Sequence, residues 1–301
     1  MKYPIDERLH KLARLNQPVN RLYFLSANAV LHPFIRTLKG KGLSHRYIKF
    51  KTEYGKVRIH LIRPENTEGA LPCMVYFHGG AFMRYAAPHH YRLMKRYALE
   101  GNIAVAFVDF YLAPKYKSNR IEGQCLSAYE YLWTHSGALC LDAKRFMTGG
   151  DSSGGFLAIK TIKLLKERNI PAPACNMLIY PLIYGLEDTR SVKEYTDTPV
   201  WNSTVLPKMW KYFKDDDYVW VTADEVNVPT YMEIAEFDCL HDADLRFCEE
   251  LRKARAEVEE VMTYATIHGY DAVDYEVTQN CLEKRIEFIL RHTIAPDICR
   301  I

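Results

Sequence analysis

The hydrophobic pattern divides the chain into two parts. Residues 5 to about 40 carry leucines and other apolar residues at roughly helical spacing, which predicts helices. Two stretches near 45–52 and 56–63, joined by a turn at 53–55, are typical of a β-hairpin. From residue 73 onward, short apolar runs alternate with longer runs of helical period. This alternation predicts a parallel sheet with helices on both faces.

The elements of the second part follow one another in a regular order. Strands are expected near 73–77, 103–108, 145–148, 177–180, 230–235 and 258–264, and helices near 86–100, 121–135, 156–160, 242–256 and 272–292. An aromatic-rich and charged insertion interrupts this order between about 183 and 228. Together with residues 1–50 it is a candidate for a cap over the strand ends, where open α/β sheets bind ligands. We therefore expect a single α/β domain over residues 1–301, with a mostly parallel central sheet and a helical cap.

One stretch at the junction of a strand and a helix is typical of a catalytic nucleophile. In residues 149–155, Ser152 has Gly150 two positions before it and Gly154 two positions after it. A tight strand-to-helix turn needs small residues at both places, and it exposes the serine oxygen at the edge of the sheet. The amide of Ser153 would then lie at a helix N-terminus, which favours an oxyanion. A glycine-rich phosphate-binding loop is the alternative interpretation.

Two later residues can complete a catalytic triad. A serine hydroxyl needs a general base, and a carboxylate must orient that base. Asp238 and His268 each follow a predicted strand, so both fall on loops at the same edge of the sheet as Ser152. The competing carboxylates Asp242 and Asp244 would open the next helix, where a role as N-cap or as partner of the helix dipole is the simpler explanation.

A second glycine-containing loop follows the first strand of the α/β part. In the segment His78-Gly79-Gly80-Ala81-Phe82, the glycines allow backbone N–H groups to point at a developing oxyanion. A glycine turn that caps a helix is the alternative. His89 and His90 follow this loop and could border the substrate, but they precede the serine and so are out of order for the base.

Composition and charge exclude several classes of function. A net charge of +3 gives no case for nucleic acid. The first fifty residues hold ten Lys and Arg against two Asp and Glu, which is typical of a solvated face, with an anionic surface or ligand as the alternative. The eight cysteines form no Cys-x-x-Cys pair, and most lie in apolar runs, which predicts buried thiols in a reducing compartment. The N-terminus lacks a signal-peptide pattern, and no apolar run reaches the roughly 18 residues of a membrane span. We expect a cytoplasmic protein without metal, cofactor or membrane span.

Five motifs in order resemble the hormone-sensitive-lipase-like branch of the α/β-hydrolases, a large set of bacterial carboxylesterases. They are His78 to Phe82, Asp109-Phe110-Tyr111-Leu112-Ala113-Pro114, Gly150 to Gly155, Asp238 to Asp242, and His268-Gly269-Tyr270. The resemblance implies the α/β-hydrolase fold, with the cap formed by residues 1–50 and the 183–228 insertion. It also allows a homodimer through the last strand and helix.

The resemblance also implies a role for each site residue. Ser152 would be the nucleophile, His268 the base and Asp238 the acid that orients the base. The implied oxyanion donors are backbone amides among Gly79, Gly80 and Ala81, together with that of Ser153. Ala81 departs from the third glycine of the family motif, and its Cβ restricts φ to mostly negative values.

These features predict a serine carboxylesterase that hydrolyses a small ester through an acyl-enzyme. Large rings are expected to close the substrate pocket and to favour short acyl chains; they are Tyr23, Phe24, Phe34, Phe82, Trp201, Trp210, Tyr212 and Phe213. The alternative is that these rings only form the core of the cap.

Two other functions are compatible with the sequence. An amidase or peptidase would use the same triad, and the run Asp215-Asp216-Asp217 could then hold an α-amine. A ligand-binding receptor on a hydrolase fold belongs to another class, but such proteins typically lose a triad member, and this chain keeps all three.

Overall fold

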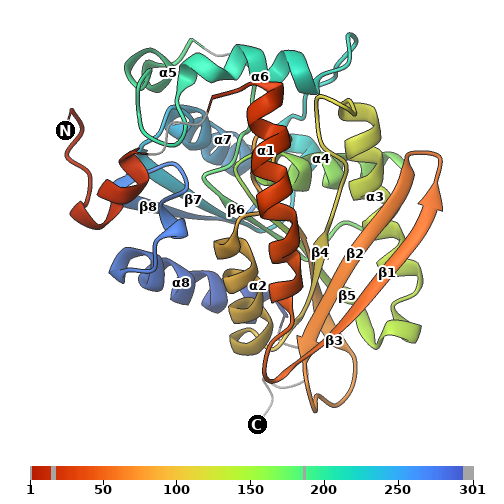
Figure 1. The fold of residues 1–301 in the computed structure, drawn as a ribbon. Helices are drawn as coiled ribbons and strands as arrows, with labels where there is room; N and C mark the ends of the chain where they lie inside the picture. The colour runs from red at the N-terminus through yellow and green to blue at the C-terminus, as the bar shows by residue number, and fades with distance from the viewer. Residues whose placement is uncertain (1, 15–17, 186–187, 294–301) are drawn as a thin grey trace.

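The computed structural model describes residues 2–14, 18–185 and 188–293 and has one sheet at its centre (Figure 1). The sheet has eight strands in the order β1-β2-β4-β3-β5-β6-β7-β8. The strands are β1 (Leu43–Thr52), β2 (Gly55–Pro64), β3 (Leu71–Phe77), β4 (Ala104–Val108), β5 (Leu141–Asp151), β6 (Cys175–Ile179), β7 (Thr230–Phe237) and β8 (Val258–Ile267).

The direction of the strands follows from their sequence patterns. The hairpin of β1 and β2 is antiparallel, and β2 also pairs antiparallel with β4. From β4 to β8 all neighbours are parallel. Every residue of β3, β4 and β6 is buried, as expected for strands that helices cover on both faces. The edge strand β1 instead alternates between exposed and more buried positions.

Helices cover both faces of the sheet. Those of the α/β part are α2 (Pro88–Glu100), α3 (Ser118–Thr134), α4 (Ser153–Glu167), α7 (His241–Lys253) and α8 (Glu276–Thr293), with short 3₁₀ turns η3 (Gly137–Leu139) and η6 (Tyr270–Ala272). One core cluster contains buried residues of α3, α4 and α7, and the other contains those of α2 and α8. The predicted α/β-hydrolase architecture is confirmed.

The remaining helices do not belong to the α/β part that surrounds the sheet. They are η1 (Glu7–Arg14), α1 (Arg21–Leu31) and η2 (His32–Leu38) from the N-terminal part, and α5 (Arg190–Glu194), η4 (Ser203–Val205), α6 (Leu206–Phe213) and η5 (Ala223–Val226) from the insertion. Figure 1 shows α5 and α6 side by side at the top, with one end of α1 beside α6. Because β1 already belongs to the sheet, the N-terminal segment outside it ends near residue 40, not near residue 50.

The described cysteines are free thiols. Cys140 is exposed, and the other six are buried, whereas Cys299 lies outside the described residues. Within the described part of the chain, no helix is both long enough and apolar enough to cross a membrane.

Candidate active site

Ser152 lies on a strained turn between β5 and α4. Its backbone has φ +53° and ψ −123°, a conformation that L-residues rarely adopt. A Cβ on Gly150 would lie 2.4 Å from the backbone of Gly154, and a Cβ on Gly154 would lie 1.9 Å from the Phe77 carbonyl oxygen. Side chains at these two positions are therefore excluded by close backbone contacts. This is the geometry of a nucleophile elbow, and it disfavours the phosphate-loop interpretation.

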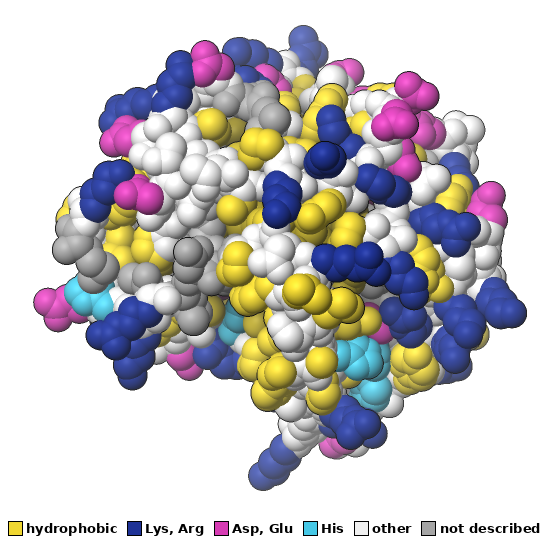
Figure 2. Space-filling view, turned by 45° about the horizontal axis from the view of Figure 1, so that its top comes forward, with side chains coloured by type: hydrophobic (Ala, Val, Ile, Leu, Met, Phe, Trp, Pro, Cys, Tyr) yellow, Lys and Arg dark blue, Asp and Glu magenta, His cyan; other side chains and the backbone are white. Residues whose placement is uncertain are grey.

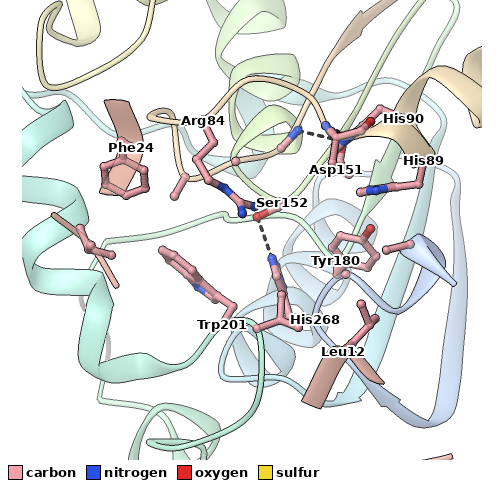
Figure 3. A pocket seen from close by; sticks show the side chains of 18 residues that line it. Leu12, Phe24, Arg84, His89, His90, Asp151, Ser152, Tyr180, Trp201 and His268 are labelled. Atoms are coloured by element: carbon pink, nitrogen blue, oxygen red, sulfur yellow. Dashed lines mark hydrogen bonds and ion pairs between the residues drawn. The ribbon is translucent and has the colours of Figure 1, made fainter. Parts of the chain in front are cut away.

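The three predicted triad residues form one hydrogen-bonded line. His268 Nε2 lies 2.8 Å from Ser152 Oγ, and His268 Nδ1 lies 2.6 Å from Asp238 Oδ2 (Figure 3 shows the first contact). The second Asp238 oxygen accepts a hydrogen bond of 3.0 Å from the Leu240 amide. Asp238 is 1% exposed and His268 is 6% exposed. The arrangement can transfer the serine proton to a buried imidazole that a carboxylate orients.

The parallel strands bring these residues together. Ser152 follows β5, Asp238 follows β7 and His268 follows β8, and these strands run in the same direction. Gly269 after the histidine has φ +73°, which glycine adopts without strain. The chain therefore turns away immediately after His268 and leaves its ring facing the serine.

The competing carboxylates do not reach the histidine. Asp242 Oδ2 accepts a hydrogen bond of 2.8 Å from the Ser191 amide, so it ties α7 to α5. Its other oxygen lies 2.9 Å from Nδ1 of His241. Asp244 is buried without a hydrogen-bond partner among the described residues, and burial together with the Asp238 charge raises its pKa well above the usual value. Both carboxylates lie in the first turn of α7, as the sequence predicts, but neither is its N-cap residue, which is Leu240.

The oxyanion loop differs from the expectation at two positions. The Gly79 amide donates a 2.9 Å hydrogen bond to Asp151 Oδ1, so it is not available to an oxyanion. Ala81 adopts φ +56° despite its Cβ, although the sequence favours a negative value. Gly80 has φ +132°, and a Cβ there would lie 2.7 Å from the Arg84 carbonyl oxygen. The amides of Gly80, Ala81 and Ser153 remain as candidate donors.

Two side chains that the sequence analysis gave no role hold this loop in place. Ser153 Oγ accepts a 3.2 Å hydrogen bond from the Phe82 amide, which joins the loop to the elbow. Asp151 accepts hydrogen bonds from the Tyr76 hydroxyl (2.8 Å) and from the Gly79 amide, and it pairs with His90 Nε2 at 3.0 Å. The only sequence signal for these roles was their position beside the nucleophile.

The ion pair between Asp151 and His90 is buried. Burial alone would lower the pKa of His90, but the Asp151 charge and hydrogen bond outweigh it, so the pKa is raised. Burial alone would likewise raise the pKa of Asp151, but the charge and hydrogen bond of His90 hold it well below the usual range. His90 thus borders the site, as its sequence position suggested, while its ring is committed to Asp151.

A cavity of about 180 Å³ opens above Ser152 (Figure 3). It is lined by Leu12, Val19, Phe24, Gly79, Gly80, Ala81, Arg84, Ala87, His89, His90, Asp151, Ser152, Tyr180, Val200, Trp201, His268, Gly269 and Ala272. The lining combines loops of the sheet edge with residues from both segments outside the α/β frame. Trp201 lies here as expected, with its ring 6.1 Å from that of His268.

Most of the predicted pocket rings lie elsewhere. Phe82 is 1% exposed and stacks on Phe213 with ring centroids 3.7 Å apart, and Trp210 packs edge-on against Trp220 at 4.8 Å. Phe82 and Trp210 do not line the cavity, so the structure does not support their expected contact with substrate. They form an aromatic cluster between the oxyanion loop and α6. Of the expected rings, Phe24 and Trp201 do line the cavity.

Several known esterases are similar to this chain in sequence. Ethyl acetate hydrolase of Pseudomonas putida is 28% identical over 229 residues, which cover 70% of each chain. An acetyl esterase of Salmonella schwarzengrund is 24% identical over 242 residues, covering 76% of this chain and 74% of the relative.

Solved structures share the whole fold. A bacterial heroin esterase superposes with a TM-score of 0.86 at 24% identity, covering 98% of this chain and 100% of the other. A thermostable esterase from Pseudomonas putida has a TM-score of 0.86 at 21% identity, covering 97% and 98%. A family profile described as the alpha/beta hydrolase fold matches residues 74–272. The chain therefore belongs to the α/β-hydrolases and, within them, to the hormone-sensitive-lipase-like group of bacterial carboxylesterases.

Proposed function

We propose that this protein is a serine carboxylesterase that hydrolyses small esters with short acyl chains. The observation that carries the proposal is the hydrogen-bonded line of Ser152, His268 and Asp238 at the base of a cavity of about 180 Å³. The relatives named ethyl acetate hydrolase and acetyl esterase support an ester of this size.

The reaction follows from the positions of the three residues. Ser152 Oγ attacks the ester carbonyl while His268 Nε2 takes its proton, and the tetrahedral intermediate collapses as His268 returns that proton to the leaving alcohol. A water molecule then attacks the acyl-enzyme, giving its proton to His268, and the carboxylic acid leaves as Ser152 is reprotonated. Asp238 holds the imidazole in the required tautomer and stabilises the imidazolium.

Backbone amides would stabilise the oxyanion of each tetrahedral intermediate. We assign this role to Gly80, Ala81 and Ser153, because the Gly79 amide is occupied by Asp151. Each such donor contributes about 3–4 kcal/mol to transition-state stabilisation in comparable sites.

The size of the cavity supports the preference for short acyl chains. Sites for drug-sized ligands typically measure roughly 300–1,000 Å³, well above the 180 Å³ found here. Leu12, Val19 and Phe24 from the N-terminal segment and Val200 and Trp201 from the insertion line this space, which supports a cap role for both segments. The proposal includes a cytoplasmic location, which the buried thiols support.

The amidase alternative has no specific support. Asp215, the first residue of the acidic run, binds the Ser118 hydroxyl at 2.6 Å and the Asn119 amide at 2.8 Å. It therefore anchors the start of α3 and does not line the cavity, and neither Asp216 nor Asp217 lines it. An acidic pair for an α-amine is thus missing from the described cavity lining.

A chain-length series tests the proposal. p-Nitrophenyl esters from acetate to palmitate are compared with an aryl amide, using Ser152→Ala as the control for background hydrolysis. We expect the highest kcat/KM between acetate and butyrate, lower values for longer chains, and slower cleavage of the amide. A rate that climbs through decanoate would contradict the small-pocket part, and faster amide cleavage would contradict the esterase assignment.

A further inference from the structure

Arg84 places a positive charge in the cavity of the proposed active site. Figure 3 shows its side chain reaching into the cavity between Phe24 and Ser152. The proposed ester hydrolysis gives this guanidinium no role, because the triad and the backbone amides already account for proton transfer and oxyanion stabilisation. An ordinary short ester carries no charge that would match it.

The backbone around Arg84 is fixed from two sides. Its amide donates a 2.9 Å hydrogen bond to the Gly80 carbonyl, so it lies one turn beyond the oxyanion loop. Asn28 of α1 donates to the Met83 carbonyl at 2.9 Å and accepts from the Tyr85 amide at 2.8 Å. These two bonds bracket Arg84 and hold it against the catalytic loop. The backbone of Arg84 is therefore fixed beside the catalytic loop.

The charge of Arg84 has no carboxylate partner of its own. The side chain that interacts with its guanidinium is the phenol of Tyr23, which is neutral, and Arg84 forms no ion pair with a carboxylate of the described residues. Asp151 acts on it only as a more distant charge, and that carboxylate is already bound by His90, Tyr76 and the Gly79 amide. Arg84 is half-buried, and partial removal from water lowers its pKa. A cation withdrawn from water normally has an anionic partner, and here the cavity that would hold a ligand lies beside it.

We propose that Arg84 binds a carboxylate of the substrate, so that the preferred substrate is a short ester carrying a free carboxylate. This inference rests on the proposed esterase function and narrows its substrate class. A guanidinium presents paired N–H donors in the geometry of a carboxylate, which makes arginine the usual partner for that group. The cavity of about 180 Å³ contains both Arg84 and Ser152, so the carboxylate must lie only a few bonds from the ester.

The protein surface is consistent with an anionic substrate. Figure 2 shows many Lys and Arg side chains on the face that comes forward when the top of Figure 1 is tilted toward the viewer. The first fifty residues, which include α1, hold ten Lys and Arg against two Asp and Glu. A positive field around a site raises the local concentration of anionic ligands. Surface charge by itself would not select a substrate, and the selecting group is Arg84.

Two pairs of substrates test the inference and identify the source of the carboxylate. In monoethyl succinate the free carboxylate lies on the acyl side of the ester, and ethyl succinamate has a neutral amide in its place. In acetoxyacetate the free carboxylate lies on the alcohol side, and acetoxyacetamide is the matching neutral amide. We expect kcat/KM for at least one carboxylate to exceed that for its amide by about 10–100-fold, the range for a charged hydrogen bond. Arg84→Gln should abolish this ratio, and Arg84→Lys should retain part of it. Arg21→Gln, at an exposed arginine of α1, should leave the ratio unchanged.

Each outcome has a separate meaning. Hydrolysis of none of the four compounds or of p-nitrophenyl acetate would contradict the proposed function itself. Equal kcat/KM for the carboxylate and its amide in the wild-type protein would overturn the Arg84 inference while leaving the esterase intact. An Arg84→Gln protein that loses the same factor on both members of a pair would also overturn it, because Arg84 would then act in general catalysis or folding. If that variant fails to fold, the wild-type ratio together with Arg84→Lys decides the question.

Discussion

Two arginines of this molecule differ in how their charge is compensated: Arg285 is fully buried among carboxylates, and Arg84 is half-buried beside the cavity. Arg285 of α8 is 0% exposed and donates to Glu233, Asp271 and the Tyr97 hydroxyl, with the Nε–Glu233 and both Nη1 contacts at 3.0 Å. Arg84 lines the cavity, and no carboxylate of the described residues forms an ion pair with it. The protein neutralises the charge of Arg285, whereas the charge of Arg84 has no carboxylate of the described residues beside it and faces the cavity.

The Arg285 network has a structural role beside the active site, whereas Arg84 is a candidate for substrate binding. The Arg285 network also contains Tyr180, whose hydroxyl donates to Asp271 and whose ring lies 4.9 Å from that of His268. A buried network in which every polar group has a hydrogen-bond partner is rigid, and this one packs beside the catalytic histidine. The candidates for substrate contact are instead the Arg84 charge, which no described carboxylate neutralises, and the amides of Gly80 and Ala81.

The largest expected effect on activity comes from breaking the hydrogen bond between Asp238 and His268 in the triad. Asp238→Asn should lower kcat by about 10⁴-fold, because the amide would favour the wrong imidazole tautomer of His268. Asp242→Asn is the control: its carboxylate ties α7 to α5 and does not contact the histidine. Steady-state kinetics on p-nitrophenyl acetate measure both. Equal losses in the two variants would show that the orienting carboxylate is wrongly assigned.

The two arginines should differ in their contribution to stability. Arg285→Met leaves the buried carboxylates of Glu233 and Asp271 unpaired, which should cost about 3–5 kcal/mol of unfolding free energy. Arg84→Met leaves no carboxylate unpaired and should change stability by less than about 1 kcal/mol. Urea unfolding at pH 7 measures both values. The comparison fails if Arg84→Met is as destabilising as Arg285→Met.

His78 is a buried basic side chain that, unlike an arginine, can be neutral at ordinary pH. Burial, reinforced by the positive charge of His90, lowers the pKa of His78 from 6.5 to about 4. Below pH 6.5 the unfolded chain therefore binds a proton that the folded chain does not, so stability is complete above that pH and is lost as the pH falls toward 4. The loss from this residue at pH 5 is about 2 kcal/mol.

A phenylalanine variant isolates this contribution. His78→Phe preserves ring stacking with Phe110, whose centroid lies 4.5 Å away, and removes the titration. Unfolding measured at pH 7 and pH 5 should show a smaller loss for the variant than for the wild-type protein. Equal losses would mean that His78 does not titrate in this range on unfolding.

The smallest effect is expected at the oxyanion loop. Ala81 holds φ +56°, which costs an alanine roughly 1–2 kcal/mol but a glycine almost nothing. The greater freedom of glycine in the unfolded chain offsets part of that gain. Ala81→Gly should therefore stabilise the protein by roughly 0.5–1 kcal/mol in urea unfolding. A destabilised variant would indicate that the left-handed turn is not strained.

The sequence predicted those parts of the site that depend on local turns and strand direction. The elbow at Ser152 needs glycines at fixed offsets, and parallel strands necessarily end at one edge, which brings Asp238 and His268 to the serine. The fold was predictable for the same reason: buried strands such as β3 and β4 read as continuous apolar runs.

The predictions that were wrong concern contacts between segments that lie far apart in the sequence. Nothing near Gly79 in the sequence shows that its amide is bound by Asp151, 72 positions later. Phe82 and Trp201 look alike as bulky rings, yet Phe82 packs inward against Phe213 and Trp201 faces the cavity. Arg84 stands in a loop without periodicity, so only the structure shows that its charge enters the site.

Covalent labelling of the serine tests the central claim most directly. The protein is treated with a p-nitrophenyl dialkyl phosphate, digested, and mapped by mass spectrometry, with His268→Ala as the matched variant. Ser152 has an activating imidazole 2.8 Å from its oxygen, whereas the neighbouring Ser153 hydroxyl is bound to the Phe82 amide. We predict one adduct, on Ser152, that forms far more slowly in the variant. An adduct on Ser153, or full esterase activity in a protein that acquires none, would contradict the account.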